Sequence, residues 1–209
     1  MLPTYKTQLL NTFWLRCVNE ALDALSKMIR KNVKLTNSSL KIELINNMPR
    51  LMNPQEIDTT LVYTILSGQL NCVIIITSPL KYFLRLIDIL LNKKIDYYEA
   101  LNEENKSSVL ELGNIINGYF ISFLNSLFNT RFKYEPPELS VNPYRAIEDF
   151  NFGDIYKKKT YVLLLNSDFK VEMENIEGKI FLLTEENNTD AILDMISKKV
   201  VLKLNSTSL

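Results

Sequence analysis

Apolar residues recur every three or four positions from residue 7 to residue 31, which predicts a long amphipathic helix. Alternating apolar and polar residues over 33–44 then predict a strand. Two apolar runs, 59–68 and 71–77, predict two further strands joined by a glycine-containing turn. Residues 79–92 begin with a proline, which suits the first turn of a helix, and the apolar spacing that follows predicts a second helix.

The second half of the chain repeats this order of elements. Its pattern predicts a helix over about 104–130, strands in 160–166 and 178–184, and a final helix from about 188 to 198. Two copies of helix, strand, hairpin and helix are what a gene duplication would leave.

The two halves also agree in register. A shift of 99 positions aligns residues 25–28 with 124–127, near the ends of the two long helices, and the agreement continues into the following strand. A chance overlap of two amphipathic patterns is the alternative. We predict a single domain over residues 1–209, with internal repeats at about 5–98 and 104–200 that share one sheet around a pseudo-twofold axis.

The composition is that of a globular protein, with 46% hydrophobic and 23% charged residues in a chain of 209. Lys and Arg number 24, and Asp and Glu also number 24, so no net positive charge attracts nucleic acid or an anionic membrane. No apolar run approaches the roughly 20 residues of a spanning helix, and the N-terminus does not resemble a secretion signal. We expect a soluble, cytoplasmic protein that neither binds nucleic acid nor inserts into membranes.

Histidine is absent, and cysteine occurs only as Cys17 and Cys72, which both lie in apolar stretches. The chain therefore lacks the usual ligands of zinc and redox metals and the imidazole base of hydrolase triads. We expect two buried, reduced thiols and no metal site.

One narrow polar stripe runs along the second long predicted helix. At about 100° per residue, Ser107, Glu111, Asn114 and Gly118 fall on one side of this helix. Glu111 and Asn114 are three positions apart and are therefore neighbours on the helix surface, so they can contact the same bound molecule. A solvated helix face is the plain alternative. The opposite side is apolar and predicts the buried face, which consists of Val109, Leu112, Ile116, Phe120, Phe123 and Leu127.

Two glycines lie within the same helix. A glycine in a helix interior costs about 1 kcal/mol relative to alanine, so Gly113 and Gly118 indicate places where a partner backbone or helix approaches closely. We expect Gly118, which lies on the stripe, to be a close-contact position for a partner.

The stripe and a later proline resemble the signature of the CheC/CheX/FliY family of chemotaxis phosphatases. That signature is an acidic residue or Ser, three free positions, Glu, two free positions and Asn, with a Pro about twenty-one residues further on. Ser107, Glu111 and Asn114 fit this spacing, and Pro136 lies 22 positions after Asn114. Residues 79–120 also resemble CheC, which is the most similar member.

The resemblance implies a duplicated α/β (α+β) fold, with a largely antiparallel sheet and two long signature helices related by a pseudo-twofold axis. It further implies a phosphatase that removes the aspartyl phosphate of a CheY-like response regulator, whose own site supplies Mg²⁺, so that the protein needs no cofactor itself. Asn114 would orient the attacking water, and Glu111 would pair with the regulator's active-site lysine. Ser107 would cap the helix or contact the partner, and Pro136 would shape the neighbouring strand.

The first half of the chain lacks the signature. The shift of 99 positions places four different residues at the signature positions: Gln8, Thr12, Leu15 and Asn37. Thr12 and Leu15 offer neither a carboxylate nor an amide, so we expect the first site to be degenerate and any activity to come from one motif.

Two other functions compete with the phosphatase. One is a noncatalytic CheC-like interaction protein that binds the deamidase CheD or a flagellar switch component. The other is a generic α/β domain whose polar stripe has no partner.

Overall fold

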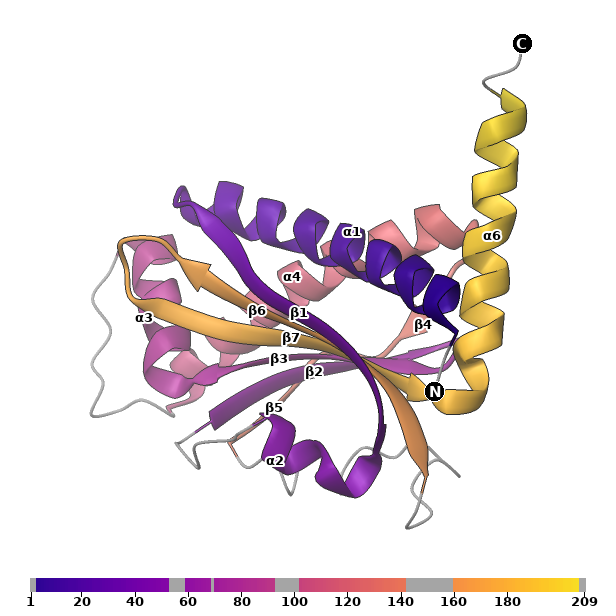
Figure 1. The fold of residues 1–209 in the computed structure, drawn as a ribbon. Coiled ribbons are helices and arrows are strands. Elements are labelled where there is room, and N and C mark those ends of the chain that lie inside the picture. Colours follow the sequence, from indigo (N-terminus) through magenta and orange to yellow (C-terminus); the bar gives the residue numbers. More distant parts are fainter. Residues whose placement is uncertain (1–2, 53–58, 69, 93–101, 142–159, 207–209) are drawn as a thin grey trace.

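Two long helices, α1 (Thr4–Ile29) and α4 (Glu103–Phe128), lie on one side of an antiparallel β-sheet (Figure 1). The structure is a computed structural model, and it describes residues 3–52, 59–68, 70–92, 102–141 and 160–206. The other helices of this part are α2 (Met48–Met52), α3 (Leu80–Leu91) and α6 (Thr189–Ser206), with short 3-10 turns η1 (Ile45–Asn47) and η4 (Glu186–Asn188).

Local chemistry sets the ends of the two long helices. The side chain of Asn102 accepts a hydrogen bond from the backbone N–H of Asn105 at 2.8 Å, which caps the start of α4. Arg30 and Asn129 adopt the left-handed conformation that ends α1 and α4, with φ of 53° and 50°. The predicted helices at 7–31 and 104–130 are thus confirmed to within a few residues.

The sheet has seven strands in the described part of the chain, and every recorded pairing is antiparallel. Their order is β1-β6-β7-β3-β2-β4, and β5 pairs with β2 as well. In chain order they are β1 (Val33–Leu44), β2 (Thr59–Ser67), β3 (Cys72–Pro79), β4 (Lys133–Tyr134), β5 (Glu138–Ser140), β6 (Tyr161–Val171) and β7 (Ile176–Glu185). The prediction of an α+β fold with a largely antiparallel sheet is confirmed.

The strand order is symmetric about the β7–β3 pair. Each half of the chain contributes one hairpin to the centre, β2–β3 from the first half and β6–β7 from the second. Each half also places its first strand beside the hairpin of the other half, β1 on β6 and β4–β5 on β2. The boundaries of the two repeats, about 5–98 and 104–200, stay a prediction.

The two outer strands are both irregular at matching places. The pairing of β1 with β6 shifts register between Leu35 and Asn37. In the second half, β4 and β5 are separated by residues 135–137, which include Pro136 and Pro137. A proline has no N–H to donate to a sheet ladder, so a proline pair favours a break in an edge strand. Pro136 lies at this break, and its role in shaping the strand stays a prediction.

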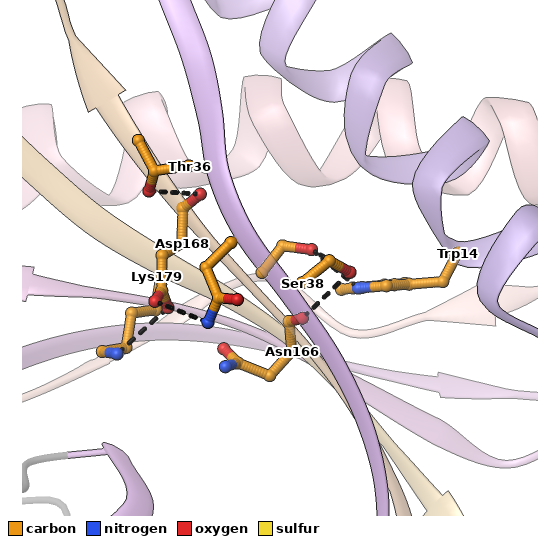
Figure 2. A network of polar contacts seen from close by, with 8 residues as sticks. Trp14, Thr36, Ser38, Asn166, Asp168 and Lys179 are labelled. Carbon is orange, nitrogen blue, oxygen red and sulfur yellow. Dashed lines mark hydrogen bonds and ion pairs between the residues drawn. The ribbon is translucent and has the colours of Figure 1, made fainter.

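Side chains on the two sides of the sheet form two apolar cores. The larger core lies between the sheet and helices α1, α3, α4 and α6, and Trp14 is fully buried in it. Its indole N–H donates to Ser167 Oγ at 2.8 Å, and that hydroxyl donates to Ser38 Oγ at 3.1 Å, so α1, β6 and β1 are joined (Figure 2). The smaller core lies on the opposite side, where Met48 and Met52 of α2 cover the sheet.

Some elements differ from those predicted. The short helix α2 was not expected, because five residues are too few to show a helical period. Pro79 is the last residue of β3 and precedes α3, instead of forming its first turn. The last helix is longer than 188–198 and extends away from the rest of the ribbon in Figure 1.

The close approach predicted for Gly113 is made within the chain and not by a partner. A methyl group at position 113 would lie 2.2 Å from Cγ1 of Val62, which projects from β2. Around Gly118, by contrast, a methyl group would meet nothing within 4 Å. Gly113 therefore lets α4 lie directly against the sheet, while Gly118 leaves open space beside the stripe.

These two glycines predict opposite effects of one substitution. Gly113→Ala should lower the free energy of unfolding by about 1–3 kcal/mol, because the core is overpacked against Val62. Gly118→Ala is the matched control and should raise it by up to about 1 kcal/mol, since alanine favours the helix. Urea denaturation of both variants measures the difference; equal effects of the two substitutions would contradict the packing.

The two thiols provide a second test of the core. Cys17 and Cys72 are free and fully buried, as expected from the sequence. Burial raises the pKa of Cys17 well above its usual range and the pKa of Cys72 to about 12. The folded state therefore retains both protons, and its stability should be intact below about pH 8.5, the usual pKa of a thiol, and should fall as the pH rises towards 12. At pH 8 a thiol reagent should react with both cysteines only after denaturation; rapid labelling of the native protein would contradict this.

Candidate functional site

The stripe on α4 faces away from the sheet. Ser107, Glu111 and Asn114 are exposed. Four of the residues predicted to form the buried face are buried: Val109, Leu112, Ile116 and Phe120. Phe123 and Leu127 are only partly buried, because the C-terminal end of α4 lies beside an open groove.

The polar groups of the stripe are available for binding. Within the described residues, the side chains of Ser107, Glu111 and Asn114 make no hydrogen bond or ion pair with the rest of the chain. Residues three apart on a helix have Cβ atoms about 5–6 Å from each other. Glu111 and Asn114 thus present two carboxylate acceptors beside an amide that both donates and accepts.

The α4 helix is attached to the sheet directly behind this pair. Gly113 lies against Val62, and one turn later Asn117 donates from Nδ2 to Thr64 Oγ1 at 2.8 Å. Both partners of that hydrogen bond are about 1% exposed. The sequence reasoning missed Asn117, although an amide on the apolar side of a helix pattern signals a buried polar contact. These contacts give the exposed pair a rigid support.

The remaining predicted residues of the second site have separate positions. Ser107 does not cap α4, since Asn102 does, so the capping role suggested for Ser107 is wrong. Gly118 follows Asn114 by one turn and is partly buried, with open space beside it. Pro136 is exposed between β4 and β5, and β5 contacts α4.

The corresponding positions of the first half have different surroundings. Gln8 and Thr12 are exposed on α1, and the Thr12 hydroxyl donates to the backbone carbonyl of Gln8 at 2.9 Å. Leu15 is partly buried. These three positions therefore present no pair equivalent to Glu111 and Asn114.

Asn37 belongs to a structural network on β1. Its Nδ2 donates to Asp168 Oδ2 at 3.2 Å, while Lys179 Nζ lies 3.0 Å from Asp168 Oδ1 (Figure 2). Thr36 Oγ1 donates to the Asp168 carbonyl oxygen at 3.2 Å. Asn37, which was predicted to belong to a degenerate first site, therefore links three strands of the sheet.

Across the described ranges, no group of three or more Cys, Asp or Glu side chains is placed to hold a metal ion. Likewise, none of the helices in those ranges is long and apolar enough to cross a membrane.

Solved structures with the same fold come from chemotaxis and flagellar proteins. FliY from Thermotoga maritima is 14% identical, covers 95% of this chain and 99% of its own, and gives a TM-score of 0.69. CheX from Borrelia burgdorferi, in a complex with CheY, BeF3 and Mg²⁺, is 21% identical over 81% of this chain and 96% of its own, with a TM-score of 0.54. The FliM middle domain from H. pylori is 10% identical over 93% of this chain and 99% of its own, with a TM-score of 0.60.

Sequence comparison gives a different outcome from structural comparison. No protein-family model matches the chain, and no curated protein matches it. The likeness is therefore one of architecture, at 8–21% identity. It confirms the resemblance inferred from the sequence at the level of the fold: the chain has the CheC-like fold found in FliY, CheX and the FliM middle domain.

Proposed function

We propose that this protein is a phosphatase that hydrolyses the aspartyl phosphate of a CheY-like response regulator, with the α4 stripe as its single active motif. The observation that supports this most directly is the exposed, unpartnered pair Glu111 and Asn114 on a rigidly seated helix. The fold adds support, because CheX with the same fold occurs in a complex with CheY, BeF3 and Mg²⁺.

The chemistry needs little from the phosphatase itself. An acyl phosphate is labile, and the regulator brings Mg²⁺ with its own phosphoryl group, so positioning and electrostatics are sufficient for catalysis. This suits a chain without histidine. In the proposed mechanism this protein supplies no metal and forms no covalent intermediate.

Asn114 is the proposed water-positioning residue. Its amide can accept a hydrogen bond from the attacking water and donate to a neighbouring oxygen, which orients the water for in-line displacement. A carboxylate at this position would repel the phosphoryl oxygens. Because α4 is fixed to β2 through Asn117 and Thr64, the amide enters the regulator's site from a rigid surface.

Glu111 is the proposed docking residue. It would form a charge-assisted hydrogen bond with the active-site lysine of the regulator and so set the register of Asn114. Ser107 would contact the regulator at the start of the stripe, and the open space at Gly118 would admit its backbone. Pro136 would act indirectly, through the strand break beside α4.

The other candidate is a noncatalytic interaction protein that binds CheD or a flagellar switch component. The FliM middle domain, whose fold this chain shares, supports that candidate. The two candidates agree on binding and differ on turnover.

Removal of the Asn114 amide tests the phosphatase. Asn114→Ala should slow the protein-dependent loss of phosphate from a phosphorylated CheY-like regulator by roughly a hundredfold, the usual effect of losing one positioned polar group. Glu111→Ala should instead weaken regulator binding by about 1.5–3 kcal/mol, as expected for a hydrogen bond to a charged group. Asn19→Ala, at an exposed asparagine on α1, is the matched control and should leave the rate unchanged.

Phosphate release and regulator binding are measured side by side. No acceleration by the parent protein would refute the phosphatase, and binding without turnover would support the interaction protein. Neither binding nor turnover would support a domain whose stripe has no partner.

The first half provides a test of the single-motif proposal. Thr12→Ala and Leu15→Ala should leave the rate of phosphate loss within about twofold of the parent protein, because neither side chain offers a carboxylate or an amide. The same phosphate-release assay applies. Because Leu15 is partly buried, a melting curve checks that the Leu15→Ala variant is folded. A loss as large as that from Asn114→Ala would contradict one active motif.

A further inference from the structure

An open groove of about 540 Å³ lies where the N-terminal end of α1, the C-terminal end of α4 and α6 meet. Its apolar lining comes from all three helices: Leu9, Phe13, Phe123, Leu127 and Ile196. Gln8 and Thr12, two positions of the degenerate first site, lie on its wall. The groove thus includes part of the predicted degenerate first site, while α4 and α6 of the second half complete its lining.

The same region of the second half has a different character. The 99-residue alignment pairs Tyr5 with Glu104 and Leu9 with Ser108. The first half thus has an aromatic and an aliphatic side chain at positions where the second half has polar side chains. The side chain of Tyr5 is 64% exposed. Exposed apolar surface of this kind marks interaction sites.

We propose that this groove binds an amphipathic helix of a partner protein, which presents an apolar face and an acidic side chain. The groove follows one face of α1 from Tyr5 to Arg16, about 16 Å or three turns at 1.5 Å per residue. A helix laid between two helices makes the usual ridge-and-groove contacts.

Charge selects an acidic partner. Among the groove-lining residues that the structure describes, Arg16 is the one with a charged side chain. Its guanidinium lies 6.0 Å from the centroid of the Phe123 ring, and it has no ion pair in the described part of the chain. An apolar occupant that excludes water from this cation must supply a counter-charge, or else the cation remains buried without a partner.

The shape favours a helix over other occupants. Tyr5, Gln8, Thr12 and Arg16 are exposed along the wall, so a small molecule would stay largely in solvent, whereas ligand pockets bury most of their ligand. The walls are helices, whose backbone groups are already paired, so an extended peptide would find no strand edge to join.

Selection from a displayed library of 16-residue amphipathic helices with randomised apolar and polar faces tests this inference, with the full-length protein as bait. Enriched peptides should share an apolar stripe and at least one Asp or Glu. Leu9→Gln should weaken their binding at least tenfold, while Leu91→Gln, the same change at an exposed leucine of α3, should have no effect. Arg16→Gln should remove the preference for acidic peptides over their amide versions.

A second variant excludes a folding artefact. Thr12→Trp fills the groove from an exposed position and should also abolish peptide binding, while the dephosphorylation of a CheY-like regulator continues unchanged. No enrichment, or peptides that bind the Thr12→Trp variant equally well, would overturn the groove as a helix site. Saturable binding of decanoate without any enriched peptide would overturn the helix as the occupant.

Discussion

The antiparallel pairing of β3 with β7 joins the two halves of the chain into one sheet. Six residue pairs, from Cys72 opposite Thr184 to Thr77 opposite Lys179, connect the two central hairpins. On each side of this contact, the outer strand of a hairpin pairs with the first strand of the other half. The exchange of first strands means that neither half can complete its part of the sheet alone. The β3–β7 pairing therefore lies at the centre of a sheet whose outer pairings, β1 with β6 and β4–β5 with β2, also join the two halves.

The helices α1 and α4 lie on this sheet in different ways. In the 99-residue alignment, Trp14 of α1 is the counterpart of Gly113 of α4. Trp14 fills the space between its helix and β6 and is anchored through Ser167, whereas Gly113 allows α4 to contact Val62 of β2 directly. At equivalent positions on the two sides of the pseudo-twofold axis, a large anchored aromatic holds one helix on the sheet, and a glycine lets the other helix touch it. The Gly113 contact brings α4 against the sheet, and one helical turn further along α4 the Asn117–Thr64 hydrogen bond joins the helix to the same strand.

Much of this architecture follows from local patterns. The long helices, the two hairpins and the buried thiols are visible in the sequence because apolar spacing reports local structure. The order of the strands is not visible, since the pairing of β1 with β6 joins residues more than 100 positions apart, such as Leu40 and Leu165. Contacts of single residues were also missed: Gly113 looked like a partner contact, and the partner of Asn117 lies on another element. The exposed stripe was predicted because helical geometry alone decides which residues share a face.

On α4 the exposed polar stripe is separate from the contacts that hold the fold, so the residues of such a stripe can change while the fold persists. The side chains of Ser107, Glu111 and Asn114 make no hydrogen bond or ion pair within the described residues, so the sheet and its helices do not depend on these side chains. Substitution of such residues alters what the surface can bind at little cost in stability. The opposite holds for Asn37, which is tied into the Asp168 network, and for Asn117, which is buried. The same separation explains why proteins with this fold at such low identity need not share an activity, since the side chains that decide it are the ones that the fold does not require.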